Sequence, residues 1–291
     1  MGRYGLDPLT TSLRQTPCKL PLYLAALLLL LPAFCYSAVF GDGDPDNGIE
    51  DSRTDPPAQL LKAVGTVFCD GGLRGTATLV SANPSTNRGR PSIIVTAAHV
   101  LFDAETGLPF SNCSYRSQNK RLNSVPFAEI SQHAYRPLSH NKMRQSEADI
   151  VFVALQRRLH QQPLLLALPD SASQLQLLAY NPQNERINIS GGCQSFSSGN
   201  FVSEHLLLHN CDAESGSSGG PLLEQAYLND QSEVNQRVIA IHGGTLSNAG
   251  NNAPGSKAQP ERWINQARKI DQLLLQRLKD FIAYLGRGSE D

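Results

Sequence analysis

The chain has 291 residues, with 25 basic and 26 acidic side chains and a formal net charge of −1. This length is sufficient for one large domain or two small ones. Because the charges balance, the composition gives no reason to expect binding to nucleic acid or to a charged membrane surface.

The first 38 residues have the organisation of a secretory signal peptide. Basic residues precede an apolar run that begins at Leu20, and the small residues Ser37 and Ala38 follow that run. The apolar run is short for a membrane span, which needs about 20 residues. The polar stretch before it is long for a signal peptide, so a retained single-pass anchor is the alternative. A cleaved signal predicts a secreted or periplasmic protein, with membrane contact only if the segment is retained.

Residues 39–58 are acidic and rich in Gly and Pro, which indicates a linker or a propeptide-like segment. The folded domain is then expected over residues 59–291. Short runs rich in Val, Ile, Leu and Thr recur there between turn residues, and they predict an all-β barrel or sandwich rather than alternating strands and helices. These runs cover residues 63–69, 75–81, 92–97, 149–155, 175–180, 201–209 and 237–242.

The last part of the chain has a different period. Apolar residues from Trp263 to Leu285 recur every three or four positions, which predicts an amphipathic helix over residues 260–286. Pro260 near its start and Gly286 at its end are typical helix boundaries. We expect this helix to pack on the domain; a helix that binds a partner or a membrane is the alternative.

Without the signal peptide, four cysteines remain: Cys69, Cys113, Cys193 and Cys211. In an exported chain they predict two disulfides, for which three pairings are possible. Cys69–Cys113 with Cys193–Cys211 is favoured, because each bond then stays within one half of the chain. No CxxC pair or paired Cys/His spacing indicates a zinc site, so no metal is expected.

Three motifs carry the side chains that activate a serine. His99 follows an apolar strand and a small-residue turn, Asp149 begins an apolar run, and Ser218 lies within Gly216-Ser-Ser-Gly-Gly-Pro221. A serine hydroxyl is a weak nucleophile unless a base takes its proton and a carboxylate orients that base. We therefore predict Ser218 as nucleophile, His99 as general base and Asp149 as the orienting carboxylate. Each motif alone also has a structural interpretation: a Gly/Ser turn, a structural histidine and a strand-capping aspartate.

The backbone N–H groups of Gly216 and Ser218 are the expected donors to an oxyanion, because glycines around the serine let the chain turn tightly. Asp103, four residues after His99, is interpreted as a local turn residue.

The strings Thr-Ala-Ala-His99, Asp149-Ile-Val-Phe-Val and Gly216-Ser-Ser-Gly-Gly-Pro221 resemble the three signature regions of trypsin/chymotrypsin-like serine proteases. The resemblance covers roughly residues 60–285. It implies two six-stranded antiparallel β-barrels, at about 59–160 and 161–258, with the active site in the cleft between them and a C-terminal helix. It also implies hydrolysis of protein or peptide substrates through an acyl-enzyme, without a cofactor, by a monomer.

Within that family, Cys211-Asp212 and Ile241-His-Gly-Gly244 are most similar to the bacterial glutamyl-endopeptidase-like branch. Two departures matter. Val100 stands where a cysteine often follows the histidine, so the disulfide that braces that turn is absent. Ser217 stands where many animal enzymes carry the aspartate that receives a newly cut N-terminus, so activation through that ion pair is not expected.

The resemblance places four residues in the substrate pocket: Asp212, His242, Gly243 and Gly244. His242 matches the histidine that binds a glutamate side chain in glutamyl endopeptidases. Asp212 matches by plain counting the pocket aspartate that selects Arg or Lys in trypsin, and a structural role for it is the alternative. The two residues indicate opposite substrates, so specificity stays open, with a slight preference for an acidic or small residue.

Two other functions are compatible with the sequence. Gly216-x-Ser218-x-Gly220 also satisfies the nucleophile pattern of α/β-hydrolase esterases, and Asp230 and His242 follow it. The other is a secreted binding protein on a protease scaffold that has lost its chemistry.

Overall fold

The computed structural model describes residues 51–81, 91–118, 124–169, 174–224, 237–248 and 259–287. All of them belong to one compact unit. The predicted signal peptide, residues 1–38, and the start of the predicted linker, residues 39–50, lie outside these ranges. Within the described ranges, a search for helices that could span a membrane finds none.

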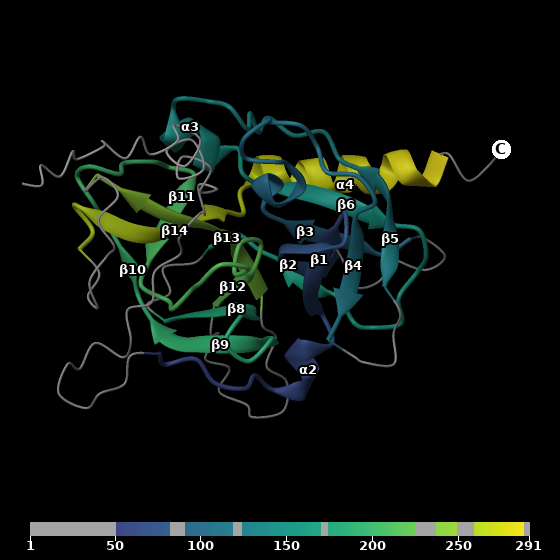
Figure 1. Ribbon diagram of the computed structural model, residues 1–291, viewed down its shortest axis with the longest axis horizontal. Coiled ribbons are helices and arrows are strands. Elements are labelled where there is room, and N and C mark those ends of the chain that lie inside the picture. Colours follow the sequence, from purple (N-terminus) through teal and green to yellow (C-terminus); the bar gives the residue numbers. More distant parts are fainter. Residues whose placement is uncertain are drawn as a thin grey trace, which may run out of the picture. The chain divides into compact units, whose positions relative to one another are not determined.

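Six antiparallel strands in the first half of the unit form a closed barrel, here called barrel one (Figure 1). The pairings run β1–β2–β3–β6–β5–β4, and β4 pairs with β1 to close the ring. A closed ring leaves no unpaired sheet edge. The strands are β1 (Val64–Cys69), β2 (Gly72–Ser81), β3 (Ile93–Thr96), β4 (Ser114–Ser117), β5 (Val125–Ile130) and β6 (Val151–Leu155).

The second half forms barrel two. Its pairings run β8–β9, β10–β11–β14–β13–β12 and back to β8. Only Gln194 separates β9 from β10, so the two count as one interrupted strand and the ring has six members. The strands are β8 (Leu175–Asn181), β9 (Arg186–Cys193), β10 (Ser195–Phe196), β11 (Leu206–His209), β12 (Pro221–Glu224), β13 (Arg237–Ser247) and β14 (Trp263–Lys269). The prediction of two six-stranded antiparallel barrels is confirmed.

The barrels are joined through β7 (Leu164–Leu166), which pairs in parallel with both β2 and β13. Successive residues of a strand point to opposite faces. In β2, Leu79 therefore packs in the interior of barrel one, whereas Val80 points into a second cluster. That cluster also contains Ile241 of barrel two and Leu278 of the C-terminal helix, so it fills the interface between the barrels.

The C-terminal helix α4 (Gln272–Arg287) packs its apolar face, including Leu274, Leu278 and Phe281, into this interface cluster. The helix is confirmed, but its predicted start at residue 260 is wrong, because Trp263–Lys269 is strand β14. β14 lies between β11 and β13 and is buried on both faces, so its apolar residues show no alternation that would mark a strand. The carboxylate of Asp271 accepts a hydrogen bond from the N–H of Leu274 (2.9 Å) and caps the helix.

Both predicted disulfides are present. Cys69–Cys113 joins the end of β1 to the residue before β4, and Cys193–Cys211 joins the end of β9 to the segment after β11. Each bond therefore stays within one barrel, as the sequence argument assumed.

Residues 51–58 of the predicted linker contact barrel two. Thr54 exchanges two backbone hydrogen bonds with Ile189 of β9, at 2.9 and 2.8 Å. The short helix α2 (Ala58–Leu61) follows, and Leu60 joins the interface cluster. This part of the linker is therefore bound to the domain.

Candidate active site

His99 and Asp149 lie in contact in barrel one. His99 belongs to the short 3-10 helix η2 (Ala98–Leu101), and Asp149 lies between α3 (Lys142–Glu147) and β6. Nδ1 of His99 is 2.7 Å from Oδ2 of Asp149, and the backbone N–H of His99 donates to Oδ1 at 2.8 Å. Asp149 is only 4% exposed. His99 is thus hydrogen-bonded to both carboxylate oxygens of Asp149, which fixes the orientation of the imidazole.

The surroundings of His99 favour its protonated form. Burial is the largest single effect and lowers the pKa of the imidazole. The charge of Asp149 and the hydrogen bond to it together raise the pKa by more, so the pKa of His99 lies above its ordinary value of 6.5. A base whose protonated form is stabilised in this way is suited to accept a proton during a reaction.

The turn that carries Ser218 is bound to both barrels. The carbonyl of Ser218 accepts a hydrogen bond from the N–H of Thr76 in β2 (2.8 Å), and the N–H of Gly219 donates to the carbonyl of His242 in β13 (2.8 Å). Ser218 itself is 6% exposed. The serine therefore lies where strands of the two barrels meet.

Gly219 brings this turn against the segment that leads to His99. Its φ of +87° is in the region that favours glycine, and a Cβ there would lie 3.1 Å from the N atom of Ala97 and even closer to Thr76 and Thr96. Ala97 is two residues before His99. Among the described interactions, the Ser218 hydroxyl makes no hydrogen bond of 3.5 Å or less with His99. The backbone contacts of Ser218 and Gly219 therefore place the serine turn beside the segment that leads to His99.

The N–H groups of Gly216 and Ser218 are free to bind a ligand. Gly216 has a φ of +94°, and its carbonyl accepts a hydrogen bond from the Thr76 hydroxyl (2.8 Å). Within the described residues, neither of the two N–H groups donates to a protein atom. A pair of such donors beside a serine is the arrangement that stabilises an oxyanion.

A buried histidine pair borders this turn. Nε2 of His209, at the end of β11, is 3.2 Å from Nδ1 of His242 in β13, and both side chains are fully buried. Burial lowers the pKa of His209 to about 3, and burial with the charges of His209 and His99 lowers the pKa of His242 well below 6.5. Both imidazoles are therefore neutral near pH 7.

The hydrogen bonds indicate the tautomers of the pair. The N–H of Cys211 donates to Nδ1 of His209 (3.2 Å), so a neutral His209 carries its proton on Nε2. That proton points toward Nδ1 of His242, which leaves His242 with its own proton on Nε2. His242 is thereby an uncharged imidazole, and the backbone of Gln266 is among its hydrogen-bond partners.

The two predicted pocket glycines differ in their surroundings. A Cβ at Gly243 would lie 3.1 Å from Oδ2 of Asp149 and would overlap the amide of Gln266, so glycine is needed for this close approach. Gly244 has a φ of +126° and no atom within 4 Å of an added Cβ. Gly243 therefore packs against the His99–Asp149 pair, whereas Gly244 borders open space.

Asp212 is engaged by the chain itself. It is 1% exposed, and one carboxylate oxygen accepts hydrogen bonds from the N–H (2.8 Å) and the hydroxyl (2.6 Å) of Ser52. Its own N–H donates to the hydroxyl of Ser190 (2.9 Å). These contacts favour the structural alternative for Asp212 over a role in reading a basic substrate side chain.

Sequence reasoning missed two residues near the site. His209 ends an apolar run two residues before Cys211, and only its place beside that cysteine could have indicated a role. Arg53 forms a buried ion pair with Glu214 (3.0 Å). No local pattern indicates this ion pair, because its two members are far apart in the chain.

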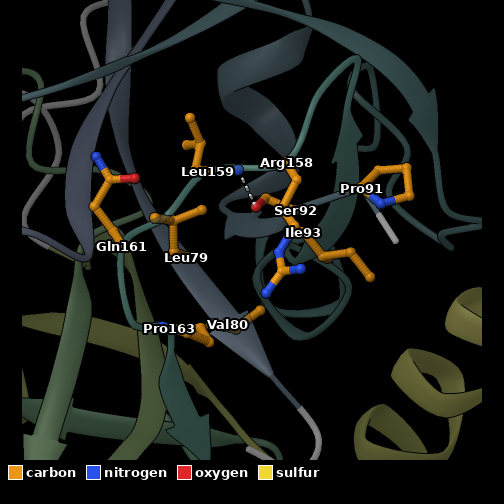
Figure 2. A pocket seen from close by; sticks show the side chains of 9 residues that line it. All are labelled: Leu79, Val80, Pro91, Ser92, Ile93, Arg158, Leu159, Gln161 and Pro163. Carbon is orange, nitrogen blue, oxygen red and sulfur yellow. Dashed lines mark hydrogen bonds between the residues drawn. The ribbon is translucent and has the colours of Figure 1, made fainter. Parts of the chain in front are cut away.

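A cavity of about 40 Å³ lies on another part of barrel one. It is lined by residues of β2 and β3 and by the segment from Arg158 to Pro163 (Figure 2). The N–H of Leu159 donates to the hydroxyl of Ser92 across it (2.8 Å). The cavity has room for about one water molecule and contains none of the candidate catalytic residues. Within the described ranges there is also no cluster of His, Cys, Asp and Glu suited to a metal ion.

The local fold argues against the α/β-hydrolase alternative. That fold places its serine on a turn from a strand into a helix. Here Ser218 is followed by strand β12, in a barrel of antiparallel strands. His242 pairs with His209, and Asp230 lies outside the described residues.

No protein-family model matches the sequence, and neither does any curated protein. Solved structures are similar in fold. A Glu endopeptidase in complex with MPD has a TM-score of 0.57 and 16% identity, covering 84% of this chain and 100% of its own. A thermostable serine protease from an extremophilic microorganism has a TM-score of 0.55 and 14% identity, covering 78% and 99%.

Neuropsin, a serine protease expressed in the limbic system of mouse brain, has a TM-score of 0.54 and 17% identity, covering 79% of this chain and 98% of its own. At this level of identity the comparison concerns the fold. The described part of this chain has the fold of the chymotrypsin-like serine proteases.

Proposed function

We propose that this protein is a serine endopeptidase that uses Ser218, His99 and Asp149 as its catalytic residues. The observation that carries the proposal is the double contact of Asp149 with His99, at 2.8 and 2.7 Å, beside the glycine-rich turn that holds Ser218. The fold shared with serine proteases supports it.

The reaction proceeds in two steps. The Ser218 hydroxyl attacks the carbonyl carbon of the scissile peptide bond while Nε2 of His99 takes its proton, and Asp149 stabilises the imidazolium that forms. The N–H groups of Gly216 and Ser218 bind the oxyanion. His99 then gives the proton to the leaving amine, which leaves an acyl-enzyme. In the second step water attacks the acyl group, with His99 again acting as the base.

The surroundings of the pocket residues favour an acidic or small residue before the cleaved bond. Asp212 is bound to Ser52, which engages its carboxylate, and His242 is an uncharged imidazole flanked by Gly243 and Gly244. An uncharged imidazole does not repel a carboxylate, and it offers no negative charge to an ammonium or guanidinium group. The match to a Glu endopeptidase supports the same preference.

The two disulfides support a location outside the cytoplasm, where such bonds persist. Protein or peptide chains are the expected substrates, and the catalytic step requires no cofactor.

The test is fluorophosphonate labelling together with digestion of a peptide mixture read by mass spectrometry. We expect labelling of Ser218 that Ser218→Ala abolishes and that His99→Ala slows by at least about 10³-fold. His160→Ala is the matched control, because His160 is exposed and outside the site, and it should be labelled like the unaltered protein.

Cleavage should follow Glu, Asp or small residues rather than Lys or Arg. A folded protein that neither reacts with the probe nor cleaves peptides would favour the alternative of a binding protein without catalysis. Cleavage after Lys and Arg would refute the pocket assignment alone.

A further inference from the structure

Residues 51–55, here called the upstream segment, lie against residues 212–217, here called the serine loop. Ser52 donates two hydrogen bonds to Asp212 at one end of the serine loop, and Arg53 forms an ion pair with Glu214 near its middle (3.0 Å). Thr54 pairs with Ile189 of β9, which fixes the upstream segment on barrel two. A segment about 160 residues away in sequence thus holds the loop that precedes the nucleophile.

Arg53 is buried between two carboxylates. Its side chain is 1% exposed, and Nε donates to both carboxylate oxygens of Asp51 at 2.8 and 3.0 Å. Burial, the largest effect, lowers the pKa of Arg53, but the hydrogen bonds and charges of Asp51 and Glu214 raise it by more. A buried charge that loses one of its partners is strongly destabilised, so this contact holds the loop firmly.

Glu214 is hydrogen-bonded to the part of the serine loop that carries the proposed oxyanion donors. Oε1 of Glu214 accepts a hydrogen bond from the side chain of Gln183 (3.0 Å), and Oε2 forms the ion pair with Arg53 without a hydrogen bond of its own among the described residues. The N–H of Glu214 donates to the hydroxyl of Ser217 (3.0 Å), and its carbonyl accepts from the N–H of Ser217 (2.9 Å). Ser217 lies between Gly216 and Ser218, whose N–H groups are the proposed donors. A displaced Glu214 would therefore displace both of them.

We propose that Arg53 is a positioning residue that orders the serine loop through Glu214, so that the oxyanion site forms without a newly cut N-terminus. This inference rests on the proposed function. The hydroxyl of Ser217 donates to the backbone carbonyl of Tyr180 (3.2 Å), and it carries no charge that could bind an amino terminus. The ordering charge comes from inside the chain, from a side chain that is present whether or not the protein is cut upstream.

The test compares Arg53→Gln, Arg53→Lys, Glu214→Gln and the double variant in the full-length protein. Arg237→Gln is the matched control, because Arg237 forms another Arg–Glu pair in barrel two, with Glu224 (3.2 Å), away from the serine loop. Active sites are counted with a fluorophosphonate, so kcat refers to folded, reactive molecules only. Amide hydrogen exchange of residues 212–217 reports the order of the loop.

We expect Arg53→Gln and Glu214→Gln each to lower kcat by about 10- to 100-fold, the effect of weakening oxyanion donors, with a smaller change in KM. Arg53→Lys should recover part of that loss, and the double variant should be no worse than either single change. Exchange of residues 212–217 should become faster in Arg53→Gln and not in Arg237→Gln.

An unchanged kcat and unchanged loop exchange in Arg53→Gln would overturn the inference, as would an equal loss of kcat in Arg237→Gln. If the unaltered protein fails to react with the probe, the proposed function falls. The exchange measurement still decides about Arg53: faster exchange confined to the Arg53 and Glu214 variants supports the role, and equal exchange in all variants overturns it.

Discussion

The contact between His99 and Asp149 allows a quantitative prediction for Asp149→Asn. The carboxylate accepts two hydrogen bonds, one from a backbone N–H that can only donate and one from Nδ1 of the imidazole. An amide in this place has one acceptor and one donor. If its oxygen stays with the backbone N–H, its NH₂ group faces Nδ1, and the neutral imidazole must carry its proton on Nε2. In that tautomer Nε2 cannot accept the proton of Ser218.

Two losses add in this variant. The first loss is the hydrogen bond between the imidazole and a charged carboxylate, which contributes about 1.5–3 kcal/mol. The second is the cost of freeing Nε2 of its proton, because this breaks the new hydrogen bond from the amide to Nδ1 and costs about as much again. The sum of about 3–6 kcal/mol corresponds to a loss of about 10²- to 10⁴-fold in kcat, at 1.36 kcal/mol per tenfold. The pKa of His99 should also fall, because Asp149 raises it and burial alone would lower it.

The assay is kcat on a peptide substrate, together with the pH at which kcat/KM rises on the acid side. His99 must be neutral to act as base, so this rise should lie above pH 6.5 in the unaltered protein and move to lower pH in Asp149→Asn. Asp103→Asn is the control, because the carboxylate of Asp103 accepts its hydrogen bonds from Glu105 and Thr106 in its own turn, four residues after His99. A folded Asp149→Asn protein with less than a tenfold loss of kcat would refute the assigned role of Asp149.

Two further predictions concern the free energy of unfolding, measured by urea denaturation in a Ser218→Ala background to prevent self-digestion. Gly219→Ala should cost about 2–5 kcal/mol, because the new Cβ adds steric overlap to an unfavourable φ. Gly71→Ala is the control: Gly71 has a similar φ of +78° but no atom within 4 Å of an added Cβ, so this change should cost only about 1 kcal/mol. Equal costs would contradict the packing argument. The second prediction concerns His209, whose pKa is lowered by burial in the folded protein. As the pH falls below 6.5, this histidine takes up a proton in the unfolded chain but not in the folded protein, so stability falls. At about 1.4 kcal/mol per pH unit, His209 alone should remove about 2 kcal/mol of the free energy of unfolding between pH 6.5 and 5. His209→Gln should flatten this loss, and an unchanged pH dependence would exclude His209 as its cause.

The sequence predicted those parts of the fold that depend on local patterns. Glycines around Ser218 and small residues before His99 indicated turns, and the structure has them. The pairing of four cysteines was favoured on distance along the chain and is confirmed. The spacing of Leu274, Leu278 and Phe281 correctly indicated a helix, because only one face of α4 is buried.

Strands that are buried on both faces were harder to recognise. β12 and β14 pack against a barrel interior on one side and against a neighbouring layer on the other, so they show no alternation of apolar and polar residues. In β14 the spacing of Trp263 and Ala267 happened to match a helix. β5 was missed for the opposite reason, since Pro126 interrupts it and most of its residues are exposed or half-buried.

Contacts between distant residues could not be predicted at all. Nothing near Arg53 in the sequence indicates Glu214, and nothing near Ser52 indicates Asp212, because each pair forms only when barrel two folds against the upstream segment. The histidine pair has the same origin, since β11 and β13 approach each other across β14. Sequence reasoning therefore named the three candidate catalytic residues and missed the residues that hold their surroundings.

Thr76 has a consequence for the order in which the proposed catalytic residues come together. This one residue of barrel one binds the carbonyls of both Gly216 and Ser218, while its hydroxyl also accepts the N–H of Tyr180. During synthesis from the N-terminus, the residues of barrel one, including His99 and Asp149, are made before the turn that holds Ser218. Under the proposed function, a chain that has made only that half lacks its nucleophile and cannot digest its neighbours.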